Sequence, residues 1–193
     1  MTKWEAQIRM GHYLKAHNIY HETDHENGTP HMNILYANCD LCPDGMLEGC
    51  IWFYENTMEV RTYFNQNAAG WCRTSSHILE LMRLLNFINA RVWPSAADGM
   101  GNALYTPSCL YTPRIYLTED AGYDITLTTI IPYDFYELAP LETEDYITAC
   151  CPGVLNDLSP AIFGVLLGRI DVERGIRYIR KNILCDNRGE AHS

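Results

Sequence analysis

Apolar residues are most concentrated in one stretch of the chain, residues 75–93, which reads SSHILELMRLLNFINARVW. Spacings of three and four residues, the period of a helix, place many of them on one face. This face consists of Ile78, Leu81, Met82, Leu85, Ile88 and Val92. Leu79, Leu84 and Phe87 fall outside it, so the helix has to be covered on more than one side. The pattern predicts a central helix, ended by Pro94, that packs on a sheet and on a second element.

Alternation of apolar and polar residues predicts strands on either side of this helix. Before it, residues 31–39, 50–55 and 58–65 form expected strands with turn-forming sequences between them. The alternation is clearest in the third strand, where one side consists of Met58, Val60, Thr62 and Phe64. After the helix, residues 114–119 and 123–131 flank Asp-Ala-Gly, a strong turn signal. We therefore predict a three-stranded antiparallel meander and a hairpin, which together form one sheet.

Several segments between these elements are expected to be loops. Residues 17–30 turn polar and contain Asn-Gly-Thr-Pro, a loop signature. Residues 66–74 are expected to be a loop that leads to the central helix, whose N-cap would be Ser75 or Ser76. Residues 95–113 are rich in Gly, Ala, Ser and Pro and form a long connection.

The last third of the chain is expected to be helical. Thr143 is the expected cap of a helix with acidic residues in its first turn, where the helix dipole favours them. Pro152-Gly153 is expected to interrupt or end this helix, and Ser159-Pro160 to begin a short one over residues 161–167. Asp171 would then cap a final helix that ends near residue 183.

The predicted order is helix, three strands, helix, two strands and further helices. The opening helix covers residues 4–16, because Thr2 followed by Glu5 matches a capping box. This order gives an α+β fold, in which an antiparallel sheet packs against the central helix. The sequence contains no internal repeat and no convincing domain boundary. We therefore expect one domain over residues 1–183 and a flexible C-terminal tail at residues 184–193.

Composition narrows the classes of function. The 24 acidic and 14 basic residues give a net charge of -10, which argues against nucleic-acid binding and would suit a basic partner. The N-terminus lacks the pattern of a secretory signal, and no apolar run approaches the roughly 20 residues of a membrane span. We therefore expect a cytoplasmic protein whose eight cysteines are reduced thiols.

The chain resembles the YbjN-like family of putative bacterial sensory-transduction regulators, which shares a type III secretion chaperone-like fold. The helix residues that carry the resemblance are Leu84, Leu85, Asn86, Asn89 and Ala90. The hairpin at residues 114–131 and the acidic-capped helix from Thr143 follow in matching order. The resemblance implies a compact, usually dimeric domain without catalytic residues to carry over. In the secretion chaperones, exposed sheet or helix faces bind a partner polypeptide.

A metal site is the main alternative. His21-Glu22-Thr23-Asp24-His25 spells H-E-x-x-H, the motif of zinc-dependent hydrolases, and His17 lies four residues before it. In those enzymes the motif lies inside a long helix, where its two histidines bind zinc and its glutamate is the general base. Because Asn-Gly-Thr-Pro follows at once, surface histidines in a polar loop are the favoured interpretation.

The cysteines offer a second possible metal site. Cys39 and Cys42 form a C-x-x-C sequence, and Cys50, Cys72 and His31 lie close enough in sequence to supply further ligands. A second C-x-x-C at the usual distance is absent. Ordinary reduced cysteine is therefore favoured over a zinc site, and redox chemistry is disfavoured because Pro-Asp-Gly opens a turn rather than a helix.

Other features have simpler interpretations. The final predicted helix carries a basic stripe of Arg174, Arg177, Arg180 and Lys181, which suits a solvated helix C-terminus better than an anion or partner site. Trp71 and Trp93, with the tyrosines, could line a groove, although aromatic residues mostly fill cores and interfaces. Asn86 and Asn89 interrupt the central helix, and we predict that both hydrogen-bond to neighbouring backbone.

No G-x-S-x-G, P-loop or G-x-G-x-x-G sequence is present, so nucleophile-elbow and nucleotide-binding functions have no motif. The leading hypothesis is therefore a non-enzymatic, homodimeric module that binds a protein or peptide in a chaperone-like or regulatory role. It needs no cofactor, binds no nucleic acid and enters no membrane. The alternative is a metal-binding protein or zinc-dependent hydrolase that uses His21, Glu22 and His25.

Overall fold

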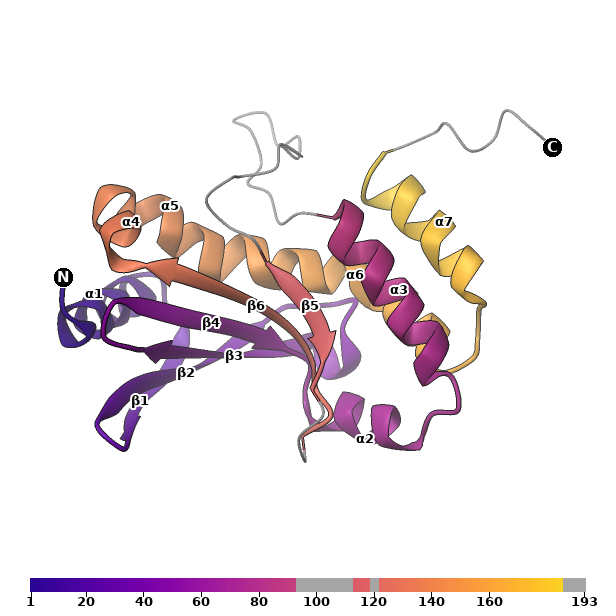
Figure 1. Ribbon diagram of the computed structural model, residues 1–193, viewed down its shortest axis with the longest axis horizontal. Coiled ribbons are helices and arrows are strands. Elements are labelled where there is room, and N and C mark those ends of the chain that lie inside the picture. The colour runs from indigo at the N-terminus through magenta and orange to yellow at the C-terminus, as the bar shows by residue number, and fades with distance from the viewer. Residues whose placement is uncertain (93–112, 119–121, 186–193) are drawn as a thin grey trace.

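A single antiparallel sheet forms the middle of the protein (Figure 1). The structure, a computed structural model, describes residues 1–92, 113–118 and 122–185. The six strands lie in the order β1-β2-β3-β4-β6-β5. They are β1 (Tyr20–Glu26), β2 (Thr29–Ala37), β3 (Met46–Phe53), β4 (Thr57–Tyr63), β5 (Arg114–Leu117) and β6 (Ile125–Pro132). The predicted α+β class is confirmed.

The predicted strands before the central helix are present as β2, β3 and β4. In β4 the side predicted to carry Met58, Val60 and Thr62 is the buried one, since each of these residues is at most 1% exposed. The predicted hairpin is also present, because β5 and β6 pair antiparallel. The first two residues of its predicted turn, Asp120 and Ala121, lie outside the described residues, as does residue 119. So do most of the predicted 95–113 connection, Trp93, and residues 186–193 of the predicted tail.

The prediction of a loop at residues 17–30 is wrong, because β1 and the start of β2 occupy most of it. β1 pairs with β2 along its whole length, from Tyr20 opposite Leu35 to Glu26 opposite Thr29. It is an edge strand with little burial, so it lacks the alternation of apolar residues that marks a half-buried strand. Asn-Gly at its end, which was interpreted as a loop signal, forms the tight turn of the hairpin. Both of its residues have positive φ angles, 51° and 77°.

The described part of the chain also contains eight helical segments, besides a short 3₁₀ turn, η1 (Pro43–Gly45). They are α1 (Lys3–Ala16), α2 (Gln66–Thr74), α3 (Ile78–Arg91), α4 (Tyr133–Leu138), α5 (Pro140–Asp145), the π turn η2 (Tyr146–Cys150), α6 (Cys151–Leu166) and α7 (Val172–Asn182). The loop predicted at residues 66–74 is thus a helix. Asn65 caps it by accepting a hydrogen bond from the N–H of Ala68.

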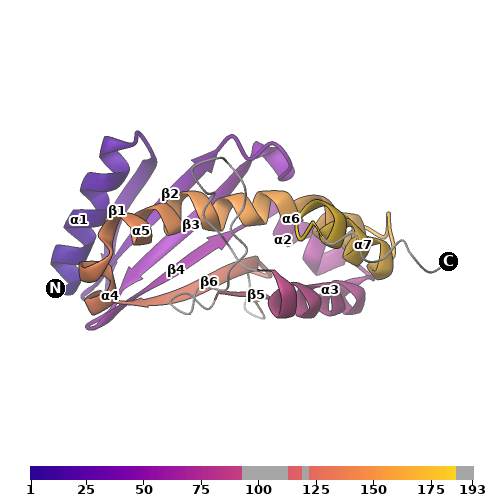
Figure 2. The same ribbon diagram turned by 90° about the horizontal axis from the view of Figure 1, so that it is seen from above.

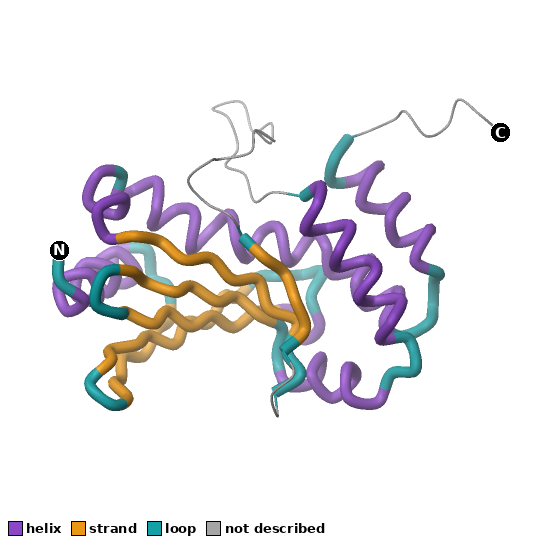
Figure 3. Tube along the Cα trace, in the orientation of Figure 1, coloured by secondary structure: helices purple, strands orange, loops and turns teal. Residues whose placement is uncertain are grey.

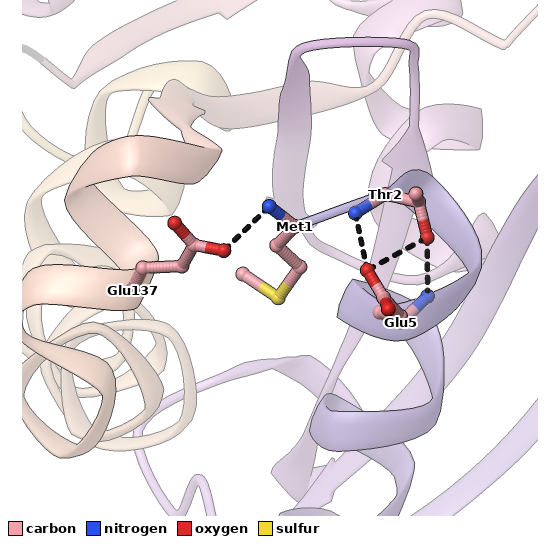
Figure 4. Close-up of polar contacts among 4 residues, drawn as sticks. All are labelled: Met1, Thr2, Glu5 and Glu137. Carbon is pink, nitrogen blue, oxygen red and sulfur yellow. Dashed lines mark hydrogen bonds and ion pairs between the residues drawn. The ribbon is translucent and has the colours of Figure 1, made fainter.

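The capping box predicted at the start of α1 is confirmed (Figure 4). The Oγ1 atom of Thr2 accepts from the N–H of Glu5 at 3.3 Å, and Glu5 Oε2 accepts from the N–H of Thr2 at 2.7 Å. The terminal ammonium group of Met1 forms an ion pair with Oε1 of Glu137 on α4, with an N–O distance of 2.5 Å. This ion pair links the first residue to the C-terminal half of the chain. The buried side of α1 packs on β1, β2 and β3.

The long helix after β6 departs most from prediction. Thr143 is not an N-cap, because it is buried inside α5 and its hydroxyl donates to the carbonyl of Ala139 at 2.8 Å. Pro152 does not end the helix either, since the π turn before it continues directly into α6. A π turn bonds residues five apart, as the N–H of Cys151 does to the carbonyl of Tyr146. Pro160 lies inside α6 and does not begin a new helix.

The helix over the sheet is α6, not α3 as predicted. Figure 2 shows α6 crossing over the strands, with α1 beside it and α3 at the far end of the sheet. α3 contacts α6, α7 and, within the sheet, β5. The second element that was predicted to cover this helix is therefore formed by the C-terminal helices α6 and α7. The predicted apolar face is only partly buried, since Met82 is 46% exposed.

By length and composition alone, residues 140–166 could cross a membrane. In the fold, 56% of the most apolar window of this segment is buried, and it supplies the helix that lies on the sheet. Its apolar composition is therefore that of a core helix. The final helix, α7, begins as predicted at Asp171, whose carboxylate accepts from the N–H of Arg174 at 2.7 Å.

Candidate functional site

The H-E-x-x-H residues lie on β1. Because a strand rises about 3.3 Å per residue, His21 and His25 share one side but are about 13 Å apart, and Glu22 points to the other side. The Nδ1 atom of His21 lies 3.0 Å from the carbonyl oxygen of Ile19. His17, at the end of α1, packs against the ring of Tyr13 and does not lie with the histidines of β1. These residues therefore lack the convergent geometry that a zinc-dependent hydrolase requires.

Cys39 and Cys42 lie side by side in a buried turn, where the N–H of Cys42 donates to the carbonyl of Cys39 at 2.8 Å. Burial raises the pKa of both thiols, that of Cys42 to about 12. Cys50 lies on β3 and Cys72 on α2, so the four do not converge. Within residues 1–92, 113–118 and 122–185, no three His, Cys, Asp or Glu side chains are placed to share a metal ion.

The sheet is covered by helices on one face. The inward residues of β2 to β4 and β6, such as Met32, Ile51 and Ile131, pack against α1 and α6 and are almost fully buried. In Figure 3 the helices α1 and α6 lie behind the strands, which face the viewer. No described helix covers the opposite side of the strands, which we call the open face. The helix α2 borders it at one end, where Gln66 and Arg73 line a hollow with Glu48 and Tyr63.

The open face carries a high share of aromatic and apolar side chains. Strand register places the following residues on it: Tyr20, His31, Leu35, Cys50, Trp52, Tyr63, Tyr116 and Ile130. Tyr20 is 61% exposed and Ile130 is 60% exposed, although both project from regular strands. At its centre His31 stacks on Trp52, with ring centroids 4.5 Å apart. Exposed apolar and aromatic residues gathered in this way are typical of a binding surface.

Charged residues on the open face are mostly acidic. Its carboxylates belong to Glu22, Asp24, Glu26, Glu48 and Glu59, and its guanidinium groups belong to Arg61 and Arg114. Arg61 Nε lies 3.0 Å from Glu59 Oε1, so one cation already has a partner. Burial, followed by the charge of Asp124, raises the pKa of Glu48. The surface as a whole therefore favours a positively charged partner.

The edge strand β1 extends this surface. It pairs only with β2, so its outer backbone groups have no strand beside them within the described chain. Glu22, Asp24 and Glu26 are the side chains that this edge presents on the open face. Antiparallel pairing of two copies of β1 about their middle would set Glu22 opposite Asp24, and like charges at opposed positions are destabilising. The acidic edge thus disfavours pairing with itself.

Other predicted candidates have internal roles. On α7, Arg180 lies over the ring of Phe87 at 5.6 Å, and so stabilises the packing of α7 on α3. Trp71 packs edge-on against Phe163 on α6, with centroids 5.5 Å apart. Trp71 thus packs against the core of the fold, whereas Arg180 is exposed, as the predicted solvated helix end requires.

Of the two asparagines on α3, Asn89 meets the prediction and Asn86 does not. Asn89 Nδ2 donates to the carbonyl of Ile115 and Asn89 Oδ1 accepts from its N–H, both at 2.8 Å. Asn86 is exposed and forms no side-chain hydrogen bond with a described residue. Asn89 therefore has a structural role, whereas Asn86 is a surface residue.

Comparison of the chain with models of protein families, with curated proteins and with solved structures gave no match.

Proposed function

We propose that the protein is a non-enzymatic polypeptide-binding module and that the open face of the sheet is its binding surface. The observation that carries this proposal is the sheet with helices on one face alone. Aromatic and apolar side chains such as Trp52, Tyr63 and Ile130 project from the other face. Burial of such side chains supplies most of the binding energy in protein interfaces.

The partner is an extended segment that combines basic and aromatic or aliphatic residues. The open face carries five carboxylates and two guanidinium groups by strand register, so a basic segment complements its charge. The net charge of -10 adds a long-range attraction for the same class of partner. The backbone of β1 offers additional hydrogen bonds to a segment that runs along the edge.

The resemblance to the YbjN-like family adds further expectations to the proposal: a cytoplasmic homodimer with a chaperone-like or regulatory role. The dimer is tested by light scattering over a range of protein concentrations. A mass that doubles as the concentration rises is the expected result, and a strict monomer at high concentration contradicts it.

Binding is tested with three labelled peptides of equal length. One combines lysines with tryptophan and leucine, the second replaces lysine by glutamate, and the third replaces the apolar residues by serine. Fluorescence anisotropy is expected to show tight binding of the first peptide alone. Equal binding of the glutamate peptide would refute the charge argument, and equal binding of the serine peptide would refute the role of the apolar residues.

Variants locate the binding surface. Trp52→Ala and Ile130→Glu are expected to weaken binding of the first peptide by about tenfold or more, which is about 1.4 kcal/mol or more. Leu79→Glu is the control, because Leu79 is 78% exposed on α3, away from the open face. If all three variants bind as the unaltered protein does, the open face is not the binding surface.

A further inference from the structure

The hairpin turn determines which backbone groups of β1 point away from the sheet. Its two turn residues both have positive φ angles, and Glu26 pairs with Thr29 across them. In a two-residue hairpin of this kind, the residues that flank the turn exchange both backbone hydrogen bonds. Hydrogen-bonded pairs alternate along antiparallel strands, so every second residue back from Glu26 bonds to β2. The residues between them, whose N–H and carbonyl groups point away from β2, are His21, Thr23 and His25.

These outward groups can pair with a further strand. β1 lies at the edge of the sheet, so no described strand occupies the position beside it. The N–H of His25 donates instead to Oδ1 of Asp24 at 2.7 Å, an exposed bond that agrees with the alternation. When a segment pairs with a sheet edge, its backbone hydrogen bonds supply affinity and its alternate side chains supply specificity. The side chains on the two sides of β1 therefore indicate which segment fits.

The side chains of β1 on the open face form an acidic row. Glu22, Asp24 and Glu26 point to this side, and all three are exposed. Every second residue of an added strand would lie on the same side, opposite or diagonal to these carboxylates. Opposite charges at such positions are favourable and like charges are unfavourable. Lys or Arg is therefore selected at alternate positions of the segment.

On the other side, an added strand would lie beside an apolar part of α1. Gln7 donates to a backbone carbonyl of β2 at 3.3 Å, and a Cβ at Gly11 would lie 3.9 Å from Nε2 of His21. This flank of α1 thus faces β1 and β2, whereas the opposite flank contacts α5 and the π turn. Trp4 and Ile8 lie three residues before Gln7 and Gly11, so they project from the flank near β1. They are 47% and 59% exposed, which leaves apolar surface for a partner to bury.

We propose that the partner segment adds to the sheet as a strand antiparallel to β1, with basic and apolar residues in alternation. Its basic residues lie on the open face with Glu22 and Asp24, and its apolar residues lie on the other side, near Trp4 and Ile8. Antiparallel pairing continues the pattern of the sheet and is the more stable per residue. This inference rests on the proposed function, and it names the conformation and the residue pattern of the bound segment.

Two peptides of equal length and composition test the pattern. In one, lysine and leucine alternate, and in the other, the lysines form one block and the leucines a second. Fluorescence anisotropy is expected to show that the alternating peptide binds about tenfold more tightly or better. Equal binding of both peptides overturns the strand addition and leaves the proposed function standing. If neither peptide binds, the proposed function fails with it.

Backbone measurements locate the contact. Binding of the alternating peptide is expected to slow hydrogen exchange of the Thr23 and His25 amides by about tenfold or more. The Asp24 amide, which bonds to β2 with or without the peptide, is the internal control. Methylation of the leucine amides of the peptide, which face β1 in the antiparallel pairing, should abolish binding, and methylation of the lysine amides should not. Unchanged exchange at Thr23 and His25, or full binding of the leucine-methylated peptide, overturns the proposal.

A matched pair of variants tests the side near α1. Ile8→Asn removes apolar surface without adding charge, and Leu79→Asn makes the same kind of change on α3, where Leu79 is 78% exposed. Ile8→Asn is expected to weaken binding of the alternating peptide by about fivefold to tenfold, and Leu79→Asn to leave it unchanged. Both residues are exposed, so the circular dichroism spectrum should not change. Unchanged binding by Ile8→Asn, or an equal loss with Leu79→Asn, overturns the proposal.

Discussion

Asn89 offers the sharpest test of how the end of the sheet is held. Its amide bonds both backbone groups of Ile115 at 2.8 Å, and so joins α3 to the edge strand β5. Replacing it by alanine removes both bonds. Ile115 is only 3% exposed and the two bonds are partly buried, so its N–H and carbonyl groups lose these partners and water replaces them only in part.

The expected loss follows from these contacts. Each hydrogen bond contributes about 1 kcal/mol net, and a buried group without a partner costs about 1 to 3 kcal/mol. Alanine regains about 0.5 kcal/mol through its higher helix propensity. We therefore expect Asn89→Ala to lower the free energy of unfolding by about 2 kcal/mol.

Asn86→Ala is the matched control on the same helix. Asn86 is exposed and bonds no described residue, so this variant should gain about 0.5 kcal/mol from helix propensity and lose nothing. Urea denaturation measures both variants, and hydrogen exchange of the Ile115 amide reports the bond directly. Equal stabilities of the two variants, or an unchanged exchange rate at Ile115, would refute the reasoning.

Four further predictions follow from local packing and burial. In thermal unfolding, Gly49→Ala should lose about 1 to 3 kcal/mol, because its Cβ would lie 2.7 Å from a ring carbon on β2. Gly70→Ala, with open space around it in α2, should gain up to about 1 kcal/mol. Burial raises the pKa of Glu48, so ionisation of its carboxyl group destabilises the folded protein. In urea titrations, Glu48→Gln should therefore become more stable relative to the unaltered protein as the pH rises from about 4 to 7. Iodoacetamide should alkylate exposed Cys185 rapidly and buried Cys151 only on unfolding, as mass spectrometry would show.

Features written locally in the sequence were predictable. The capping box needs only Thr2 and Glu5, and the strand β4 needs only its own alternation between a buried and a partly exposed side. Asp171 likewise caps α7 through its nearest neighbours. In each case the residues that specify the element lie within it or next to it in the sequence.

Features that depend on distant parts of the chain were missed. β1 is stabilised by its ladder with β2 and buries little, so hydrophobic periodicity could not reveal it. The π turn lets the long helix continue past Pro152, and nothing in the local sequence pattern indicates this turn.

The α2 helix at residues 66–74 could have been found from Asn65, a favourable N-cap, followed by a run of small residues.

The candidate site was out of reach for a related reason. Leu35 on β2 and Trp52 on β3 place large apolar side chains on the open face, so alternation in these two strands marks the covered side only weakly. That assignment depends on α6, which crosses the sheet from about a hundred residues further along the chain. H-E-x-x-H, the most recognisable motif, proved to lie on a strand, where its spacing separates the side chains.

The contacts between α1 and the C-terminal half have a consequence for synthesis on the ribosome. Met1 meets Glu137, and the Tyr13 hydroxyl donates to Asp145, which follows it by 132 residues. The strands β1 to β4 emerge long before either partner does. A nascent chain of that length holds a meander whose apolar side has no α6 to cover it. Translation therefore passes through an interval in which the growing chain is most prone to associate with its neighbours, and the interval closes only when α6 emerges.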